Sequence, residues 1–338
     1  MMIARAVALV LFFATSAVAA DRFPGATWEK VTPEAAGWSP ARLADAHVIS
    51  AVMGSTAVMI VHKGAVVEEW GEVEVKSNLH SVRKSLLSAL IGIAVAERKV
   101  DLADTMAKLG IDDNAPSLSE TERQARVVDL LKARSGIYHA ALYETSAMAS
   151  RRPPRGAHGP NTHWYYNNWD FNALGTIYER AEKRSIFAAF DERIAKPVGM
   201  QDYTPLDGSY VTGPDSDHRA YPIRMSARDL ARFALLYARE GRWNERQLVP
   251  AEWVRESVAS YSSAGPGLGY GYMWWTGPAS APPGSYFAAG NGGQYAFVVP
   301  SRDLVVVHRI NTDGGGARDP GIRQMGRFFR TILEAAPH

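Results

Sequence analysis

The sequence predicts an α/β fold of the α+β type, in which an antiparallel sheet is flanked by helices and carries an inserted all-α domain. β-rich runs occur near both ends of the chain, at 57–70 and 270–310, and a long helical middle separates them. Two of these runs, 57–62 and 65–70, flank the two-residue turn Lys63-Gly64, and so short a connection implies antiparallel pairing. We therefore expect an α/β lobe from about 21–105 and 225–338, and a helical insert at about 106–224.

Helix signals place the elements of the first half. Ser39-Pro40 is typical of an N-cap followed by proline at the first helical position, and predicts a helix to about Met53. The run 86–95 is apolar on most faces and predicts a buried helix. Ser119 and Glu122 form a capping-box pattern that predicts a short helix through Leu131. Residues 139–163 look irregular, which is typical of a functional, mobile or simply solvated loop.

The second half is predicted to return to strands. We expect a helix at about 171–181, another ending at 197–200, and a third that is N-capped by Ser226. Strands are then expected at 270–276, 286–289, 295–299 and 304–310, followed by a last helix at about 318–333.

Composition and the N-terminus restrict the kind of protein. Residues 1–20 carry Arg5, an apolar core and an Ala17-Val18-Ala19 cleavage pattern, so they predict a signal peptide and a periplasmic or secreted mature chain from 21 to 338. The apolar run is too short for a stable membrane span. The chain has no cysteine, which excludes disulfides and thiolate chemistry. A net charge of +2 without a basic stripe argues against a nucleic-acid partner.

The segment with the clearest chemistry is Ser81-Val82-Arg83-Lys84, at the start of the buried helical run. Ser81 and Lys84 are one turn apart on one helix face. A serine hydroxyl needs a base to become a nucleophile, and a lysine can be that base if its surroundings keep it neutral. Helix-start N–H groups also favour a developing oxyanion. In the alternative interpretation Ser81 is an ordinary N-cap and Lys84 is solvated.

Two later segments complete a pattern of three motifs. These are Tyr166-Asn167-Asn168 and Asn291-Gly292-Gly293. With S-x-x-K they resemble, in order, the S-x-x-K, Y-x-N and K-T-G motifs of the serine β-lactamase and penicillin-binding-protein superfamily. The resemblance is to its class C-like branch of β-lactamase-related serine hydrolases, which includes family VIII esterases, D-aminopeptidases and 6-aminohexanoate-dimer hydrolase. Further similar stretches lie at 135–137, 197–200, 271–275 and 293–300.

This resemblance implies a β-lactamase/transpeptidase-like fold, with a five-stranded antiparallel sheet, an all-α domain and a site between them. It implies acyl transfer in which Ser81 attacks a carbonyl, Lys84 takes its proton and Tyr166 relays or shares it. The Ser81 and Gln294 backbone N–H groups would form the oxyanion hole, and Asn168 would hydrogen-bond Lys84 and the substrate. No cofactor or metal is implied.

The third motif is implied to bind substrate through Asn291, Gly292 and Gly293. Other uses of the motif residues remain open at this stage. Tyr166 could be a core aromatic and Asn168 a helix N-cap, while the glycines, including Gly290, could make a turn between strands. A tyrosine is a poor base unless a nearby cation such as Lys84 lowers its pKa from about 10. The aromatic side chains of 165, 169, 270, 272, 274 and 275 could line an apolar cleft or pack in the core.

Asn291 departs from the family, whose β-lactamases and transpeptidases carry a cation at this position. Asn has no charge to pair with a substrate carboxylate. Arg151, Arg152 or Arg155 could substitute for it. We therefore expect an esterase-like hydrolase of a small-molecule or peptide-like substrate. β-Lactamase, D-aminopeptidase or DD-peptidase activity, and a non-catalytic penicillin-binding-like sensor, are the alternatives. The chain lacks G-x-S-x-G, H-E-x-x-H, P-loop and dinucleotide patterns.

Overall fold

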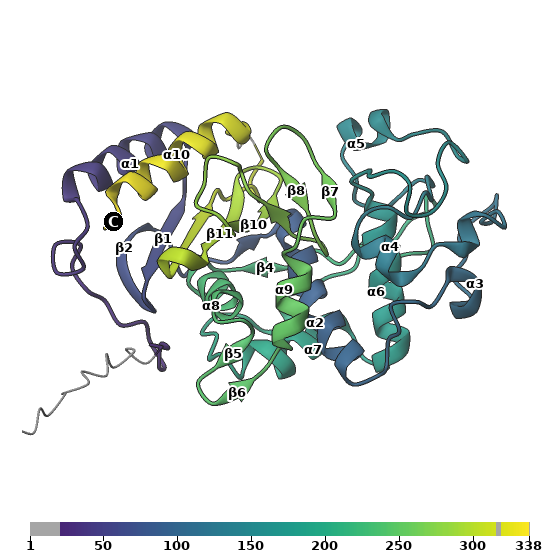
Figure 1. The fold of residues 1–338 in the computed structure, drawn as a ribbon, viewed down its shortest axis with the longest axis horizontal. Coiled ribbons are helices and arrows are strands. Elements are labelled where there is room, and N and C mark those ends of the chain that lie inside the picture. Colours follow the sequence, from purple (N-terminus) through teal and green to yellow (C-terminus); the bar gives the residue numbers. More distant parts are fainter. Residues whose placement is uncertain (1–20, 316–318, 338) are drawn as a thin grey trace, which may run out of the picture.

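An eight-stranded antiparallel sheet forms one part of the molecule (Figure 1). The computed structural model describes residues 21–315 and 319–337, so the predicted signal peptide lies outside the described residues. The sheet order is β2-β1-β12-β11-β10-β9-β8-β7. The five longer strands are β1 (Ala57–His62), β2 (Ala65–Gly71), β10 (Tyr286–Gly290), β11 (Gln294–Val299) and β12 (Leu304–Arg309). Strands from both chain ends therefore share one sheet, as predicted, because β1 pairs with β12 over its full length.

Three short strands extend this core beyond β10. They are β7 (Ser262–Ser263), β8 (Gly269–Tyr270) and β9 (Trp275–Thr276). The prediction of a single strand at 270–276 was wrong, because the chain reverses direction between Tyr270 and Trp275. Gly271 N donates to the Trp274 carbonyl at 2.8 Å, and Met273 has a left-handed φ of 61°. A tight turn of this kind splits the run into two paired strands.

Helices α1 (Pro40–Met53) and α10 (Gly321–Ala335) lie side by side over one face of the sheet (Figure 1). α1 has the predicted boundaries, because the Ser39 hydroxyl accepts the Arg42 N–H and Gly54 ends the helix in a left-handed conformation. Both helices bury apolar side chains against Val58 and Ile60 of β1 and against Phe297 of β11. This contact buries one face of the sheet.

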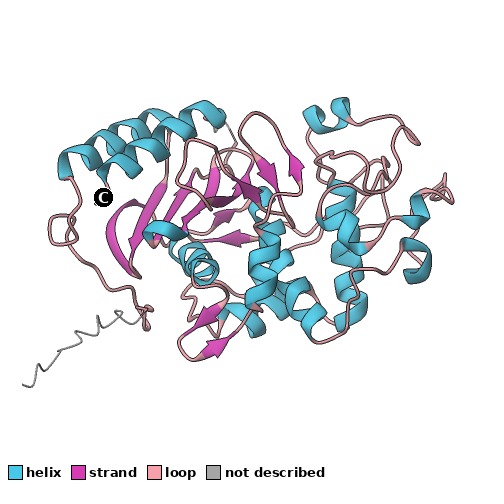
Figure 2. Ribbon diagram, viewed as in Figure 1, coloured by secondary structure: helices cyan, strands magenta, loops and turns pink. Residues whose placement is uncertain are grey.

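The opposite face is covered by a second set of helices (Figure 2). α8 (Ala227–Ala238), N-capped by Ser226 as predicted, contacts β1, β11 and β12. α2 (Arg83–Ala96) is buried over most of its length and packs on α7 (Ile186–Phe190) and α9 (Ala251–Ser257). Met59 and Val61 of β1 face this core, whereas Val58 and Ile60 face α1 and α10. The alternation follows from the two-residue period of a strand.

The remaining helices gather at the end of the molecule away from α1 and α10 (Figure 1). They are α3 (Met106–Leu109), α4 (Val127–Leu131), α5 (Ser146–Arg151) and α6 (Asn168–Glu182). The predicted capping box forms, since Ser119 N donates to Glu122 Oε2 at 2.8 Å, but it opens only a 3₁₀ turn, Glu122–Gln124. Ala125 is extended, with ψ 134°, and separates this turn from α4. The segment predicted as irregular contains α5, which Thr145 caps.

Short elements connect the two parts. α7 continues into a π-helical turn, Asp191–Ala195, and one-turn 3₁₀ helices occupy Pro205–Asp207 and Pro300–Arg302. β3 (Ser77–Asn78) pairs with β4 (Arg224–Met225), and β5 (Arg242–Trp243) with β6 (Arg246–Gln247). The β3–β4 pair matters most here, because β3 leads directly into the Ser81 segment. No helix within residues 21–315 and 319–337 is long and apolar enough to cross a membrane.

Candidate active site

Ser81 lies in a 3₁₀ turn, His80–Val82, that runs directly into α2. α2 therefore begins two residues after Ser81, which lies in the 3₁₀ turn that leads into it. His80 has a left-handed φ of 47°, which turns the chain from β3 into the helix. In this described segment neither helix start has a side-chain capping hydrogen bond. The N-cap interpretation of Ser81 is therefore wrong, and its half-buried hydroxyl is available for other contacts.

Lys84 joins the serine to a residue far along the chain. Its Nζ lies 2.7 Å from Ser81 Oγ and 2.9 Å from Tyr166 Oη. Lys84 is only 1% exposed, so the interpretation of a solvated side chain is also wrong. Within the described residues no carboxylate forms an ion pair with it. Its Nζ instead lies over the Phe171 ring, 4.9 Å from the centroid.

The surroundings of Lys84 favour the neutral amine. Burial, and secondarily the charge of Arg83, hold the pKa of Lys84 well below its ordinary value of 10.5. A neutral amine has a lone pair that can accept the Ser81 proton at the observed distance. Desolvation therefore favours the neutral form that Lys84 needs in order to act as a base.

Tyr166 stands immediately before α6 and is half-buried. Burial raises the pKa of Tyr166 to about 12. A tyrosine that acts as a base would instead need its pKa lowered by a nearby cation such as Lys84. The two directions assign the roles: Lys84 has the lowered pKa and suits the base, and Tyr166 stays a neutral phenol that can pass a proton on.

Arg83 is a buried cation beside this pair that the sequence analysis did not single out. It is 1% exposed, and its guanidinium carbon lies 5.0 Å from the ring centroids of both Tyr143 and Tyr221. Nη1 donates to the His80 carbonyl at 3.0 Å. Among the described residues, its Nε and Nη2 atoms have no hydrogen-bond partner. A guanidinium held against aromatic faces at this distance repels a proton on Lys84.

The end of β10 approaches the nucleophile through Gly290. A Cβ at this position would lie 2.4 Å from the Leu79 carbonyl oxygen and 3.1 Å from Ser81 N. A side chain here would collide with the backbone, so only glycine allows the strand to lie against the Ser81 turn. The absence of a side chain at Gly290 thus serves a close contact with the protein's own backbone.

The next two glycines form the turn between β10 and β11. Gly292 and Gly293 have left-handed φ values of 74° and 89°. Gly292 N donates to Asp319 Oδ2 at 3.2 Å, and the Gly293 carbonyl lies 2.7 Å from His308 Nδ1. Both residues are buried, and hydrogen bonds within the protein engage Gly292 N and both carbonyls. The turn interpretation is therefore confirmed, and the substrate-binding role stays a prediction.

The oxyanion role predicted for Gln294 belongs to its backbone N–H and stays a prediction. It is fully buried on β11, an inner strand, where it pairs with Gly290 of β10. Its side chain accepts from Arg309 Nε at 2.6 Å and donates to the Ile310 carbonyl at 2.7 Å. Both β10, through its Gly290 end, and β11 contact the Ser81 turn, so this end of the hairpin lies where a second oxyanion donor would be needed. Ser81 N remains the first.

Asn168 is the first residue of α6, and the N-cap is its neighbour Asn167, whose side chain accepts the Trp169 N–H. The N-cap interpretation of Asn168 is therefore wrong. Asn168 Nδ2 donates to the Tyr143 carbonyl at 2.7 Å. In the described part of the chain its Oδ1 is buried without a partner, and no hydrogen bond joins it to Lys84. The predicted contact with Lys84 is thus not formed.

Arg309 positions the whole site from the end of β12, and the sequence analysis missed it. It is 2% exposed and donates to Gln294, to the Met225 carbonyl at 2.7 Å and to the Ser77 carbonyl at 2.9 Å. One side chain therefore connects the β10–β11 turn, β4 and the strand that leads to Ser81. An arginine ending an otherwise apolar strand, Val305-Val306-Val307-His308-Arg309, was the available signal.

Aromatic side chains surround Tyr166 on one side. Its ring stacks near Trp275, with centroids 5.5 Å apart, and Trp164 lies 6.1 Å from Trp275. Trp164 and Trp275 are half-buried, whereas the predicted cleft residues Trp169 and Trp274 are fully buried in the core. The remaining predicted aromatics divide in the same way, with 270 and 272 buried and 165 half-buried.

Two of the three arginines that could replace the missing cation are held in ion pairs. Arg152 forms an ion pair with Glu144, and Arg155 forms one with Glu122 at 2.5 Å. Arg151 is exposed at the end of α5. Asn291 is exposed in the β10–β11 turn. Within the described residues no cluster of three or more His, Asp or Glu side chains could hold a metal ion.

The chain belongs to the β-lactamase family, whose model matches residues 41–326. No curated protein sequence matches the chain. Among solved structures it is similar to a protein assigned as a 6-aminohexanoate-dimer hydrolase from Bacillus anthracis, with TM-score 0.70 and 20% identity over 94% of this chain and 89% of that one. The family and the β-lactamase/transpeptidase-like fold predicted from the three motifs are thus confirmed.

Two further structures have the same fold. One is a protein assigned as a β-lactamase from Bacteroides dorei, with TM-score 0.67 and 17% identity over 88% of this chain and 99% of that one. The other is a penicillin-binding protein homologue from Caulobacter crescentus, with TM-score 0.63 and 15% identity over 88% of this chain and 99% of that one. Identities this low show a common fold and leave the substrate to be inferred from the site.

Proposed function

We propose that the protein is an exported serine hydrolase that forms an acyl-enzyme on Ser81 and acts on ester or amide bonds, preferring neutral esters to β-lactams. The observation that carries the proposal is the contact of one buried lysine with both Ser81 Oγ and Tyr166 Oη, at 2.7 and 2.9 Å. A buried amine with a lowered pKa and no carboxylate partner in the described residues costs folding free energy, which a catalytic role explains.

The geometry supports a two-step reaction. Ser81 Oγ attacks the substrate carbonyl carbon while its proton moves to Lys84 Nζ, and the carbonyl oxygen becomes an oxyanion beside Ser81 N. Collapse of this intermediate breaks the bond to the leaving group, which receives the proton from Lys84 through Tyr166. Water then attacks the acyl-enzyme by the same route and restores Ser81. The transfers between Ser81 and Lys84 and between Lys84 and Tyr166 follow the two observed contacts.

The preference for neutral esters follows from the charges around the site. A carboxylate on a β-lactam needs a cationic partner, and a hydrogen bond to a charged group contributes roughly 1.5–3 kcal/mol against about 1 kcal/mol for a neutral one. Asn291 replaces that cation, and two arginines of the nearby segment are held in ion pairs. The difference of about 0.5–2 kcal/mol corresponds to roughly 2- to 30-fold weaker binding of carboxylate-bearing β-lactams.

Export is proposed from the sequence of residues 1–20, which carry the n-region, apolar core and A-x-A pattern of a signal peptide. Its test is the N-terminal sequence of protein recovered from a periplasmic fraction. A mature N-terminus near residue 21 is expected. Recovery of the full-length chain in the cytoplasmic fraction alone would contradict export without bearing on the chemistry.

The chemistry is tested with purified protein in two steps. A fluorophosphonate probe should label wild type at Ser81, as located by peptide mass spectrometry, and should not label Ser81→Ala. Hydrolysis of short p-nitrophenyl esters is then compared with that of a chromogenic cephalosporin, p-nitroanilides and D-amino-acid peptides. Absence of both labelling and turnover would favour the non-catalytic sensor. Cephalosporin turnover as efficient as the best ester, or a clear preference for D-peptides, would favour the corresponding alternative activity.

A further inference from the structure

A second candidate binding site lies on the opposite face of the sheet from α2, between α10 and strands β10 and β11. The cavity has a volume of about 430 Å³, within the usual range of small-ligand sites. We propose that it binds a long-chain fatty acid, with the acyl chain against the sheet and the carboxylate among the arginines of α10. This inference does not depend on the hydrolase proposal.

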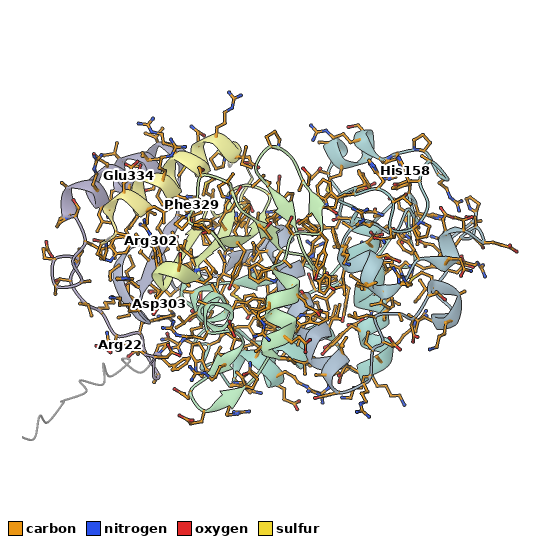
Figure 3. The ribbon with its side chains drawn as sticks, viewed as in Figure 1. Arg22, His158, Arg302, Asp303, Phe329 and Glu334 are labelled. Atoms are coloured by element: carbon orange, nitrogen blue, oxygen red, sulfur yellow. The ribbon has the colours of Figure 1, made fainter. Side chains whose placement is uncertain are left out.

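The wall of the cavity is apolar and aromatic. Phe287 and Phe297 line it from β10 and β11, and Phe329 and Met325 line it from α10. Phe297 and Phe329 (labelled in Figure 3) stack with ring centroids 4.7 Å apart, so α10 contacts β11 through aromatic rings. Apart from the arginines, the polar side chains that line the cavity are Ser280 and Tyr295. The rest of the wall offers a ligand no hydrogen bond in exchange for lost water, and it favours an alkyl chain.

The rim of the cavity is cationic. Arg323, Arg327 and Arg330 all line it, and their spacing of four and three residues places them along one stripe of α10. All three are exposed, and among the described residues none of them has an ion-pair partner. Glu334 is the only acidic residue of the helix, and it lies 4.0 Å from Arg42 of α1. Three unpaired guanidinium groups favour a carboxylate, which they can bind in a bidentate manner.

The mouth of the cavity has two features that fit an entering chain. Ile322, also a lining residue, is 59% exposed although it is a large apolar side chain. Gly326 lies between the arginines, and a Cβ built there would have nothing within 4 Å. Glycine in a helix interior costs about 0.5–1 kcal/mol relative to alanine. Gly326 thus leaves open space in the cavity, although alanine at this position would stabilise the helix.

Binding is tested with a dansyl-labelled undecanoic acid whose fluorescence rises in an apolar site, displaced by unlabelled dodecanoate. Protein already labelled at Ser81 by the fluorophosphonate probe should bind the fatty acid equally well, which separates this cavity from the catalytic site. Dodecanol, which lacks the charge, should displace the probe at least about tenfold less effectively than dodecanoate. Equal displacement by dodecanol, or no displaceable binding to wild type, would overturn the proposal.

Two variants locate the site. Gly326→Leu fills the cavity and should abolish probe binding, whereas the matched control Gly326→Ala adds one methyl group in open space and should retain it. Arg327→Gln should weaken dodecanoate binding about tenfold and leave dodecanol unchanged. Thermal unfolding checks that each variant is folded. Wild-type affinity in both Gly326→Leu and Arg327→Gln would show that fatty acid binds elsewhere.

Discussion

Replacement of Gly290 by alanine tests the account of how β10 is placed against the nucleophile. The added Cβ would lie 2.4 Å from the Leu79 carbonyl oxygen, whereas ordinary contact begins at 3.4 Å, so the two backbones must separate by about 1.0 Å (3.4 − 2.4). Neither partner can rotate away, because the oxygen belongs to the backbone. The backbone of Gly290 does not have a positive φ, so the effect of the substitution is steric alone.

Two magnitudes follow from this displacement. A misplacement of about 1 Å at a reacting centre costs on the order of 10²-fold in rate. Overpacking a close contact costs about 1–3 kcal/mol of stability, against a total of about 5–15 kcal/mol, so the protein should remain folded. We expect Gly290→Ala to lower kcat/KM for p-nitrophenyl acetate about 100-fold and to lower the urea midpoint modestly.

The measurement needs a glycine whose replacement adds a methyl group without a clash. Gly326→Ala is such a control, because its Cβ meets nothing within 4 Å, and it should keep wild-type kcat/KM. If Gly290→Ala retained more than half of the wild-type kcat/KM, the close approach of β10 to Ser81 would not be required for catalysis. The assignment of this strand end to the oxyanion site would then be wrong.

Four further predictions concern the residues around Ser81. Ser81→Ala should abolish turnover and change the free energy of unfolding by less than about 1 kcal/mol, because it caps no helix; full residual esterase activity would refute its role. Lys84→Ala and Tyr166→Phe should each slow acylation by orders of magnitude, and the double variant should be little slower than Lys84→Ala; multiplied defects would mean independent action. Arg83→Gln should raise the pKa of Lys84, so the acid limb of the pH–rate profile should shift to higher pH; an unshifted acid limb would show that Arg83 does not affect the pKa of Lys84. Arg309→Met should cost about 3–5 kcal/mol in urea unfolding, because it leaves buried carbonyl oxygens without donors, and a loss below about 1 kcal/mol would contradict its bridging role.

The features that the sequence by itself determined are local ones. Ser81 and Lys84 are three residues apart in a turn that enters a helix, so their proximity follows from backbone geometry alone. The boundaries of α1 follow from Ser39-Pro40 and Gly54, and the β1–β2 hairpin follows from Lys63-Gly64. The order of three motifs was sufficient to predict the family, because the combination is more specific than any one motif.

Only the tertiary structure decided what each motif residue does. The neutrality of Lys84 depends on burial by elements distant in sequence, and its contact with Tyr166 spans 82 positions. The same holds for the side chain of Gln294, which is held by a buried arginine of the neighbouring strand. Spacing predicts which side chains share a turn or a face, but desolvation and long-range hydrogen bonds depend on how separate segments pack. Those quantities determine a pKa or an available N–H group, and they exist only once the chain is folded.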